Sequence, residues 1–261
     1  TSHTTTFYRD IGGTHILPVK NEIGQLSFFP SYLKHWSDKH EGDDARITMA
    51  FDIYFKREFV KNKQFLKNKT IIPLEIWYID KKVCINLIEY FEKDSSKKRG
   101  VLLLKGGKPG IDIRKKLSTD TRISRENEDV EVCLYYEQLG KAMTEYKKKY
   151  KYCTDQHQPW GIMEDWNIQK YDPKEGYFTT HFERTGGLTV HRHLVFMTYL
   201  NDVKDKGETE FYYQKLKFKP ETGLTLIWGS DWTFTHRGIP SPTETKYIAT
   251  RWYSFIPPFL Y

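Results

Sequence analysis

The stretch YFTTHFERTG, residues 177–186, places His181 two positions before Glu183 among aromatic and β-branched residues. Side chains of a β-strand alternate between faces, so a strand here would put both side chains on one face. His236 follows another strand-like run, just before a turn. Two imidazoles and one carboxylate on one side of an ion form a facial triad with three open coordination positions, which suits Fe(II) with a chelating cosubstrate and dioxygen. Zinc accepts the same donors, and a chance polar pair on an exposed strand is the third alternative.

Lys246 lies ten residues after His236 and begins another strand-like run. Its neighbours on the same face would be Ile248, Thr250 and Trp252. A carboxylate held in a mostly apolar barrel must be paired, and a lysine pairs with it as a point charge. This position therefore suits the distal carboxylate of a dicarboxylate cosubstrate, although an ordinary exposed strand lysine is the alternative.

Hydrophobic periodicity divides the chain into three regions. Residues 1 to about 70 read as β, with strand-like runs at 26–29 and 46–55. From about 72 to 155 the pattern becomes helical, and two helices joined by a Gly/Lys/Ser-rich stretch are expected within 80–152. From Trp166 onward, short alternating runs are separated by turn residues, which predicts the strands 166–171, 177–183, 193–200, 209–213, 224–229 and 246–255. Such a series predicts an antiparallel sandwich or barrel with helices against one face.

Composition excludes several classes of protein. With 261 residues, 38% of them hydrophobic and 16% aromatic, the chain is neither disordered nor fibrous. It has no apolar run long enough for a membrane span and no signal-peptide pattern at its start, so we expect a soluble protein with no membrane partner. The three cysteines are widely spaced and include no CxxC pair. They favour a reducing, cytoplasmic location over a disulfide framework or a thiolate zinc site.

The formal net charge of +7 comes largely from lysine clusters at 97–99 and 147–151. Such clusters attract acidic partners or nucleic acid. They are discontinuous, however, and clusters of this kind are most often solvated faces. Nucleic acid is therefore the less favoured partner.

Three stretches of the chain, taken in order, resemble the strands of one family. They are YDPKEGYFTTHFE, HRHLVFMTYLNDVKDKGETEF and GLTLIWGSDWTFTHRGIPSPTETKYIATRWYSF. They resemble the prolyl-4-hydroxylase-type 2-oxoglutarate- and Fe(II)-dependent dioxygenases, over about residues 72–256 and most strongly over 166–255. The resemblance implies a mainly β fold with supporting helices, in which a double-stranded β-helix (jelly-roll) core spans 164–256 of a domain covering 71–261.

The resemblance also implies roles for individual residues in the centre of the site. His181, Glu183 and His236 would bind iron, and Lys246 would bind the distal carboxylate of 2-oxoglutarate. The family usually has aspartate where this chain has Glu183. The longer arm must fold back or shift the ion. We favour an active site because the other elements are all present.

The resemblance places four further residues around that centre. Tyr171 and Tyr199 match positions whose hydroxyls commonly help to hold the cosubstrate. Arg192 matches a position that often faces substrate, Trp252 matches an aromatic residue of the last strand, and both are assigned to the substrate pocket. Core packing is the alternative for the two tyrosines and the tryptophan. His191 and His193 are interpreted as strand surface or pocket lining rather than as metal ligands.

The implied activity is hydroxylation of a C–H bond in a protein, peptide or amino-acid side chain. Fe(II) and 2-oxoglutarate would be the cofactor and cosubstrate, succinate and CO2 the coproducts, and ascorbate a reductant. Two alternatives stay open: a catalytically degenerate jelly roll that acts as a binding module, and an oxygenase that modifies nucleic acid. The sequence does not predict an oligomeric state.

The N-terminal region, residues 1–70, poses a separate question. Its segment 24–55 has the same order of features as 223–255, with His35 and Arg46 standing where His236 and Lys246 stand. No His-x-Asp or His-x-Glu precedes it. We therefore interpret the region as the tail of a second, truncated or degenerate jelly roll, and a coincidence between two strand-turn-strand units is the alternative.

Overall fold

A computed structural model describes residues 5–9, 16–20, 34–37, 73–104, 106–154 and 158–256. The chain divides into two compact units. One comprises Thr1–Ile72 with Tyr150–Cys153, and the other comprises Pro73–Lys149 with Thr154–Tyr261.

The first unit contains a three-stranded antiparallel sheet in the order β2-β1-β3. Its strands are β1 (Thr5–Arg9), β2 (Ile16–Lys20) and β3 (Lys34–Ser37). His35 lies in β3 opposite Tyr8. The expected strands at 26–29 and 46–55, and with them Arg46, lie outside the described residues. The interpretation of this region as part of a second jelly roll therefore stays a prediction.

The second unit consists of two long helices, short 3₁₀ turns and many strands. The helices are α1 (Lys81–Lys93) and α2 (Val130–Lys149), and the 3₁₀ turns are η2 (Gly187–Thr189) and η3 (Trp232–Phe234). The strands are β4 (Glu75–Tyr78), β5 (Lys98–Arg99), β6 (Leu102–Leu103), β7 (Pro109–Gly110), β8 (Lys116–Leu117), β9 (Thr119–Ile123), β10 (Trp160–Gly161), β11 (Trp166–Tyr171), β12 (Gly176–Tyr177), β13 (Arg192–Tyr199), β14 (Thr209–Phe211), β15 (Leu216–Phe218), β16 (Leu224–Gly229), β17 (His236–Gly238) and β18 (Lys246–Phe255).

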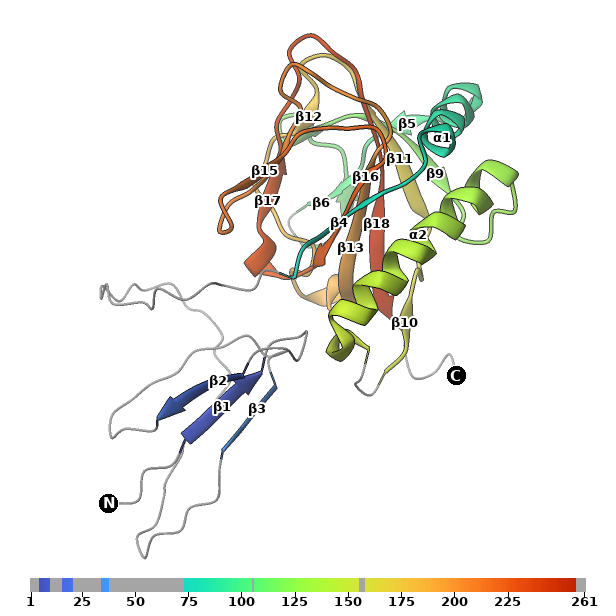
Figure 1. Cartoon of the computed structure of the whole chain (residues 1–261). Helices are drawn as coiled ribbons and strands as arrows, with labels where there is room; N and C mark the ends of the chain where they lie inside the picture. Colours follow the sequence, from blue (N-terminus) through green and yellow to red (C-terminus); the bar gives the residue numbers. More distant parts are fainter. Residues whose placement is uncertain are drawn as a thin grey trace, which may run out of the picture. The chain divides into compact units, whose positions relative to one another are not determined.

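These strands form one large antiparallel sheet in the order β4-β16-β13-β18-β11-β9-β5, with β10 beside β18. A smaller sheet, β15-β14-β17, and the pairs β12-β8 and β6-β7 complete the set (Figure 1). The expectation of a mainly β protein with supporting helices and a jelly-roll core is confirmed. None of the helices in the described parts of the chain has the length and apolar character to cross a membrane.

The helices lie on one side of the large sheet (Figure 1). Tyr135 of α2 stacks on Trp166 of β11 with ring centroids 5.1 Å apart, and its hydroxyl lies 3.0 Å from the Thr198 hydroxyl of β13. Phe91 of α1 meets Tyr247 of β18 edge to face at 5.7 Å. Because side chains alternate along each strand, the strand neighbours of Trp166, Thr198 and Tyr247 point to the opposite face of the sheet.

Two stretches differ from the sequence prediction. The expected linker between the helices contains β5 and β9, which extend the large sheet beyond β11. The sequence of β9, TDTRI, is mostly polar, so it lacks the apolar alternation that marks a strand. The expected strand 177–183 is mostly irregular, and after Tyr177 its ladder pairing is reduced to an isolated bridge between His181 and His236.

Candidate functional site

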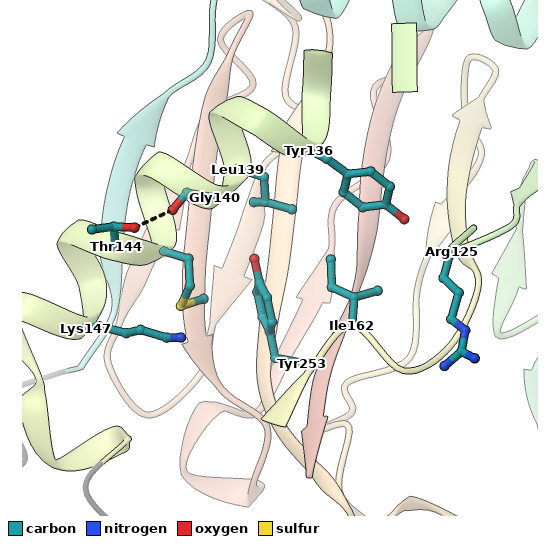
Figure 2. A pocket seen from close by; sticks show the side chains of 9 residues that line it. Arg125, Tyr136, Leu139, Gly140, Thr144, Lys147, Ile162 and Tyr253 are labelled. Carbon is teal, nitrogen blue, oxygen red and sulfur yellow. Dashed lines mark hydrogen bonds between the residues drawn. The ribbon is translucent and has the colours of Figure 1, made fainter. Parts of the chain in front are cut away.

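The sheet face opposite the helices lines a cavity of about 990 Å³. Lys246, Ile248, Thr250 and Trp252 of β18 all line it, as their shared strand face predicts. A second hollow of about 460 Å³ lies beside α2, where the Thr144 hydroxyl donates to the Gly140 carbonyl at 2.9 Å (Figure 2). The lining of this hollow includes no histidine, cysteine or carboxylate. The residues with metal chemistry therefore belong to the larger cavity.

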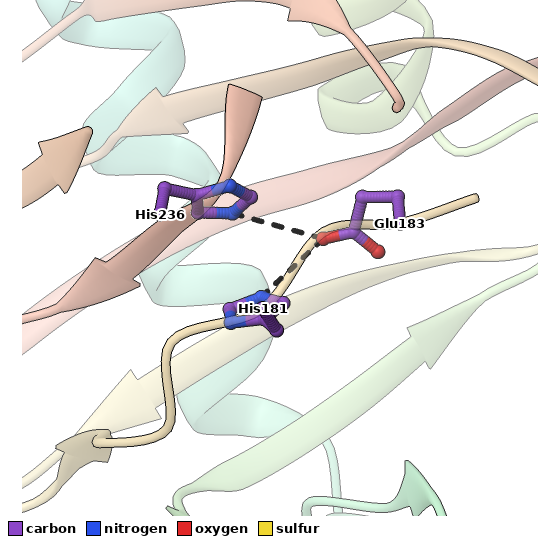
Figure 3. A group of neighbouring side chains, drawn as sticks. All are labelled: His181, Glu183 and His236. Atoms are coloured by element: carbon purple, nitrogen blue, oxygen red, sulfur yellow. Dashed lines mark ion pairs between the residues drawn. The ribbon is translucent and has the colours of Figure 1, made fainter. Parts of the chain in front are cut away.

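His181, Glu183 and His236 converge in that cavity (Figure 3). Their ligand atoms lie within 4.8 Å of one another, and no other such group occurs among the described residues. Glu183 Oε1 lies 3.4 Å from His181 Nε2 and 3.7 Å from His236 Nε2. One carboxylate oxygen thus faces both imidazoles, which is the arrangement that a shared ion requires.

The convergence comes from backbone pairing rather than from a regular strand. His181 N donates to His236 O at 2.9 Å, and His236 N donates to His181 O at 2.8 Å. Directly opposed residues of an antiparallel pair carry their side chains on the same side, so the two imidazoles face each other. Glu183 N donates to Ser230 O at 3.0 Å, which fixes the third member of the group.

Both histidines are oriented by their second ring nitrogen. His181 Nδ1 lies 2.9 Å from Thr179 O, and His236 Nδ1 lies 2.8 Å from Phe234 O. A carbonyl oxygen only accepts hydrogen bonds, so each Nδ1 donates to its carbonyl and each Nε2 is the nitrogen left for another partner. Both Nε2 atoms face Glu183, and carbonyl partners of this kind are typical of metal-binding histidines.

The other side of Glu183 is held by two residues that the sequence assigned to the substrate pocket. Trp252 Nε1 donates to Glu183 Oε2 at 2.9 Å. Arg192 Nη1 donates to the Glu183 backbone carbonyl at 2.9 Å, and its guanidinium carbon lies 3.2 Å from the centroid of the Trp252 ring. Arg192 and Trp252 do line the cavity, but their direct contacts are with the carboxylate residue and with each other.

The electrostatics of the cluster favour the protonation states that a metal needs. Burial acts to raise the pKa of Glu183, but the hydrogen bond from His181 and the charges of His181, His236 and Arg192 outweigh it and lower the pKa to about 2. Burial, followed by the charge of His181, lowers the pKa of His236 to about 4. At neutral pH the carboxylate is therefore ionised and this imidazole is neutral, which are the states that bind metal.

Lys246 lies at another part of the cavity wall, with 4% of its surface exposed. Its ammonium donates to Gly207 O at 2.9 Å and lies 3.5 Å from Ile239 O. No carboxylate in the described ranges forms an ion pair with it, and burial lowers its pKa to about 8. A buried cation whose hydrogen bonds go only to carbonyl oxygens favours an incoming carboxylate.

Tyr171 and Tyr199 both line the cavity, but their hydroxyls already have partners. The Tyr171 hydroxyl donates to Gln169 Oε1 at 2.7 Å, and the Lys246 ammonium lies 5.1 Å from the centroid of the Tyr171 ring. The Tyr199 hydroxyl lies 2.6 Å from Thr209 Oγ1 and 3.0 Å from Phe218 O, and it accepts the Thr209 N–H at 3.0 Å. These bonds tie β13 to β14 and β15, so Tyr199 has a structural role here.

The sequence interpretation did not single out two features of the site. Tyr177 stacks on His181 with ring centroids 3.7 Å apart, and it is recognisable only as an aromatic residue preceding the ligand in the same run. Lys116 Nζ lies 2.8 Å from Asp120 Oδ2 in the cavity wall. No local pattern marks this pair, because both residues come from the stretch that was expected to be a linker.

A family model matches part of the chain. Residues 166–254 match the model of the 2OG-Fe(II) oxygenase superfamily. A sequence comparison with curated proteins gives no match.

Several solved structures share the fold. A viral collagen prolyl hydroxylase from Paramecium Bursaria Chlorella virus-1, as its 2OG complex, is 20% identical with a TM-score of 0.51, and the match covers 70% of this chain and 96% of that one. A Trichoplax adhaerens prolyl hydroxylase in complex with a hypoxia inducible factor peptide fragment is 14% identical with a TM-score of 0.56, covering 70% and 83%. A Pseudomonas putida prolyl-4-hydroxylase is 14% identical with a TM-score of 0.52, covering 71% and 94%.

The matched region, residues 166–254, contains the converging His181, Glu183 and His236 together with Lys246 and the strands that carry them. The members of this superfamily are enzymes that use Fe(II) and 2-oxoglutarate. Residues 166–254 thus match the 2OG-Fe(II) oxygenase superfamily, and the unit that contains them shares its fold with the prolyl hydroxylases.

Proposed function

We propose that this protein hydroxylates a C–H bond in a protein, peptide or amino-acid side chain, with Fe(II) as cofactor and 2-oxoglutarate as cosubstrate. The observation that carries the proposal is the convergence of His181, Glu183 and His236, with both imidazole tautomers preset, in the same cavity as the buried Lys246. Bound iron and 2-oxoglutarate would supply the activation of dioxygen, with succinate and CO2 as coproducts.

Different residues of this chain would bind the metal and the cosubstrate. His181 Nε2, His236 Nε2 and Glu183 Oε1 would hold the metal on one side, which leaves the other side for the cosubstrate. Lys246 would pair with the distal carboxylate of 2-oxoglutarate. Burial of His236 and Lys246, at 7% and 4% exposed, keeps bulk water from these groups.

The glutamate at position 183 does not argue against this activity. Its Oε1 lies within 3.7 Å of both histidine nitrogens although the side chain is one methylene longer than aspartate. A degenerate binding module would have no need of two oriented imidazoles and a buried ammonium. The choice of a protein or peptide substrate is supported by analogy with the collagen prolyl hydroxylase and with the hydroxylase that was solved with a peptide.

The direct test is turnover of 2-oxoglutarate by the purified protein with Fe(II) and ascorbate. We expect succinate to form, and we expect His236→Ala to abolish it. Peptides and free amino acids can then be screened for a mass gain of one oxygen. Equal succinate production by His236→Ala would show that His236 is not a metal ligand. Failure of the folded wild-type protein to bind 2-oxoglutarate would contradict the proposed dioxygenase activity.

A further inference from the structure

The lining of the large cavity carries an excess of positive charge. It includes eight lysine and arginine side chains but only three carboxylates. All three carboxylates are already engaged: Asp120 with Lys116 at 2.8 Å, Glu164 with Arg251 at 2.6 Å, and Glu183 with the histidines. A divalent metal and a dianionic cosubstrate cancel each other's charge, so the excess would persist in the loaded site.

Apart from the buried Lys246, the lysines of the lining that lack an ion-pair partner are exposed to solvent. Lys98 of β5 and Lys115, which precedes β8, line the cavity and are exposed. Neither has an ion-pair partner among the described residues. Arg99 and Arg122 line the same wall but pair with Glu175 and Asp165, at 3.1 and 2.8 Å.

Exposed apolar side chains line the same cavity as these cations. Val101, Leu103 and Leu188 also line the cavity and are 52%, 41% and 73% exposed. Exposed apolar groups beside free cations suit a chain that offers both apolar and acidic side chains.

Two aromatic rings of the cavity, Tyr177 and Trp252, are already engaged with other side chains. Tyr177 is stacked against His181. Trp252 contacts two guanidiniums, Arg192 at 3.2 Å and Arg251 at 4.1 Å from its ring centroid. Binding of single-stranded nucleic acid normally depends on aromatic faces that are free to stack on bases.

We propose that the substrate is an acidic segment of a peptide or protein, in which aspartate or glutamate residues flank the residue to be oxidised and contact Lys98 and Lys115. This inference rests on the proposed hydroxylase function. Rim charges of this kind steer the substrate and favour acidic over basic partners, while the metal end of the cavity acts on whichever residue enters it.

Binding of labelled probes to protein loaded with Mn(II) and 2-oxoglutarate tests this proposal. The probes are a short peptide rich in Asp and Glu, its Asn/Gln counterpart, and a single-stranded RNA of equal charge. We expect the acidic peptide to bind most tightly, and the double variant Lys98→Glu/Lys115→Glu to weaken its binding about tenfold. The matched control, Lys108→Glu, changes an exposed lysine outside the cavity lining and should alter binding less than about twofold.

The outcomes distinguish the acidic-peptide proposal from the proposed hydroxylase function. Equal affinity for the acidic and neutral peptides, or tighter binding of the RNA, would overturn the acidic-peptide proposal even if Mn(II) and 2-oxoglutarate bind normally. Failure of the metal or of 2-oxoglutarate to bind in the same samples would instead contradict the proposed function. Selective loss of the acidic peptide in the double variant supports the proposal.

A second, independent observation concerns Trp252. Its indole N–H donates to Glu183 Oε2 at 2.9 Å, while Oε1 of the same carboxylate faces the two histidines. The two oxygens of the Glu183 carboxylate thus meet partners on opposite sides. An aspartate at this position has one methylene fewer, so from the same backbone its carboxylate would fall short of this position.

We infer that Trp252 is a positioning residue that adapts the metal site to glutamate. The indole N–H holds one oxygen, and so fixes the rotamer in which the other oxygen meets the metal. Glu183→Asp, which restores the family's usual residue, should therefore weaken rather than strengthen metal binding in this chain. This inference also rests on the proposed metal site.

A double-mutant cycle on Mn(II) affinity tests the coupling without requiring turnover. Trp252→Phe removes the N–H but keeps a ring, and we expect it to weaken Mn(II) binding about tenfold, as loss of a hydrogen bond to a charged group does. In the Glu183→Asp background the same change should have less than about a twofold effect, because the bond is already absent. Trp252→Leu also removes the N–H, so the test can use whichever of the two variants folds.

Trp228→Phe is the matched control. The Trp228 ring lies 5.2 Å from His236, but its indole N–H has no hydrogen-bond partner among the described residues. Its loss should leave Mn(II) affinity within about twofold. The inference is overturned if Trp252→Phe weakens binding equally in both backgrounds, or if Glu183→Asp binds Mn(II) more tightly than the wild type.

Discussion

Two ends of the cavity satisfy their polar groups in different ways: the metal end, formed by His181, Glu183 and His236, and the lysine end, formed by Lys246. At the metal end, the atoms that face away from the centre are already bonded: His181 Nδ1 and His236 Nδ1 to carbonyls, and Glu183 Oε2 to Trp252. At the lysine end, the ammonium of Lys246 has carbonyl contacts but no carboxylate partner in the described part of the chain. One end is therefore prearranged for its ligand, whereas the other holds a charge that only an incoming anion neutralises.

The comparison predicts the largest effect at the metal end. His181→Ala removes one of three ligands, and we expect Mn(II) affinity to fall by more than about 100-fold. His193→Ala is the matched control, because His193 lies in β13 outside the cavity lining and should keep affinity within about twofold. Isothermal titration with Mn(II) measures both variants. Unchanged affinity in His181→Ala would show that the cluster does not bind the metal.

At the lysine end, binding and stability should separate. Lys246→Met should weaken 2-oxoglutarate binding by about 100-fold or more, since it removes the charge that pairs with a buried carboxylate. The same change should not lower the free energy of unfolding, because burial already disfavours this ammonium. Titration of 2-oxoglutarate into Mn(II)-loaded protein and denaturant unfolding test the two parts. A large loss of stability with normal binding of 2-oxoglutarate would show that Lys246 stabilises the fold and does not bind the cosubstrate.

The lowered pKa of Lys246 also predicts a pH dependence. Burial lowers this pKa from 10.5 to about 8, so the ammonium loses its proton within the accessible pH range. Affinity for 2-oxoglutarate should fall by up to about tenfold per pH unit above pH 8. Because the unfolded chain holds this proton up to a higher pH, the lysine should also make the apoprotein more stable as pH rises from about 8 toward 10.5.

Titrations across this range give the measurement, with Lys246→Met as the control for both trends. We expect the stability gain to disappear in the variant, because it has no proton to lose at this position. A cosubstrate affinity that stays constant from pH 7 to 10 would contradict the role of Lys246.

The smallest effect is expected at Tyr199. Tyr199→Phe leaves the Thr209 N–H and hydroxyl without their partner, which should lower the free energy of unfolding by about 1–2 kcal/mol. Affinity for 2-oxoglutarate should change by less than about twofold. A large loss of cosubstrate affinity at unchanged stability would instead support the cosubstrate role that the family resemblance implies.

The sequence predicts the regular parts of the fold well because those parts are apolar on a fixed period. The strands at 224–229 and 246–255 and the helix at 81–93 have alternating or helical apolar patterns, and they occur where expected. β9 escapes prediction because its alternate positions Asp120 and Arg122 line the cavity and are charged, and the buried Thr121 between them is polar. Local periodicity does not encode that environment.

For the site, the sequence predicts which residue types meet but not how they are held. His181 and Glu183 were expected to share a face because of strand alternation, whereas the structure brings them together through the His181–His236 bridge and the Ser230 carbonyl. The bond between Trp252 and Glu183 joins residues 69 positions apart and depends on side-chain rotamers. Neither spacing nor composition specifies such a contact.

Strand β18 carries both Lys246 and Trp252 and pairs with β11 on one side and β13 on the other. The two residues share a face because they are an even number of positions apart. Deleting any single residue between them would turn one of the two toward the helices, and with it either the anion-binding charge or the support of Glu183 would be lost. The spacing within this strand is therefore under tighter constraint than the identity of the residues that fill it, and functional relatives should tolerate substitutions there far better than changes in length.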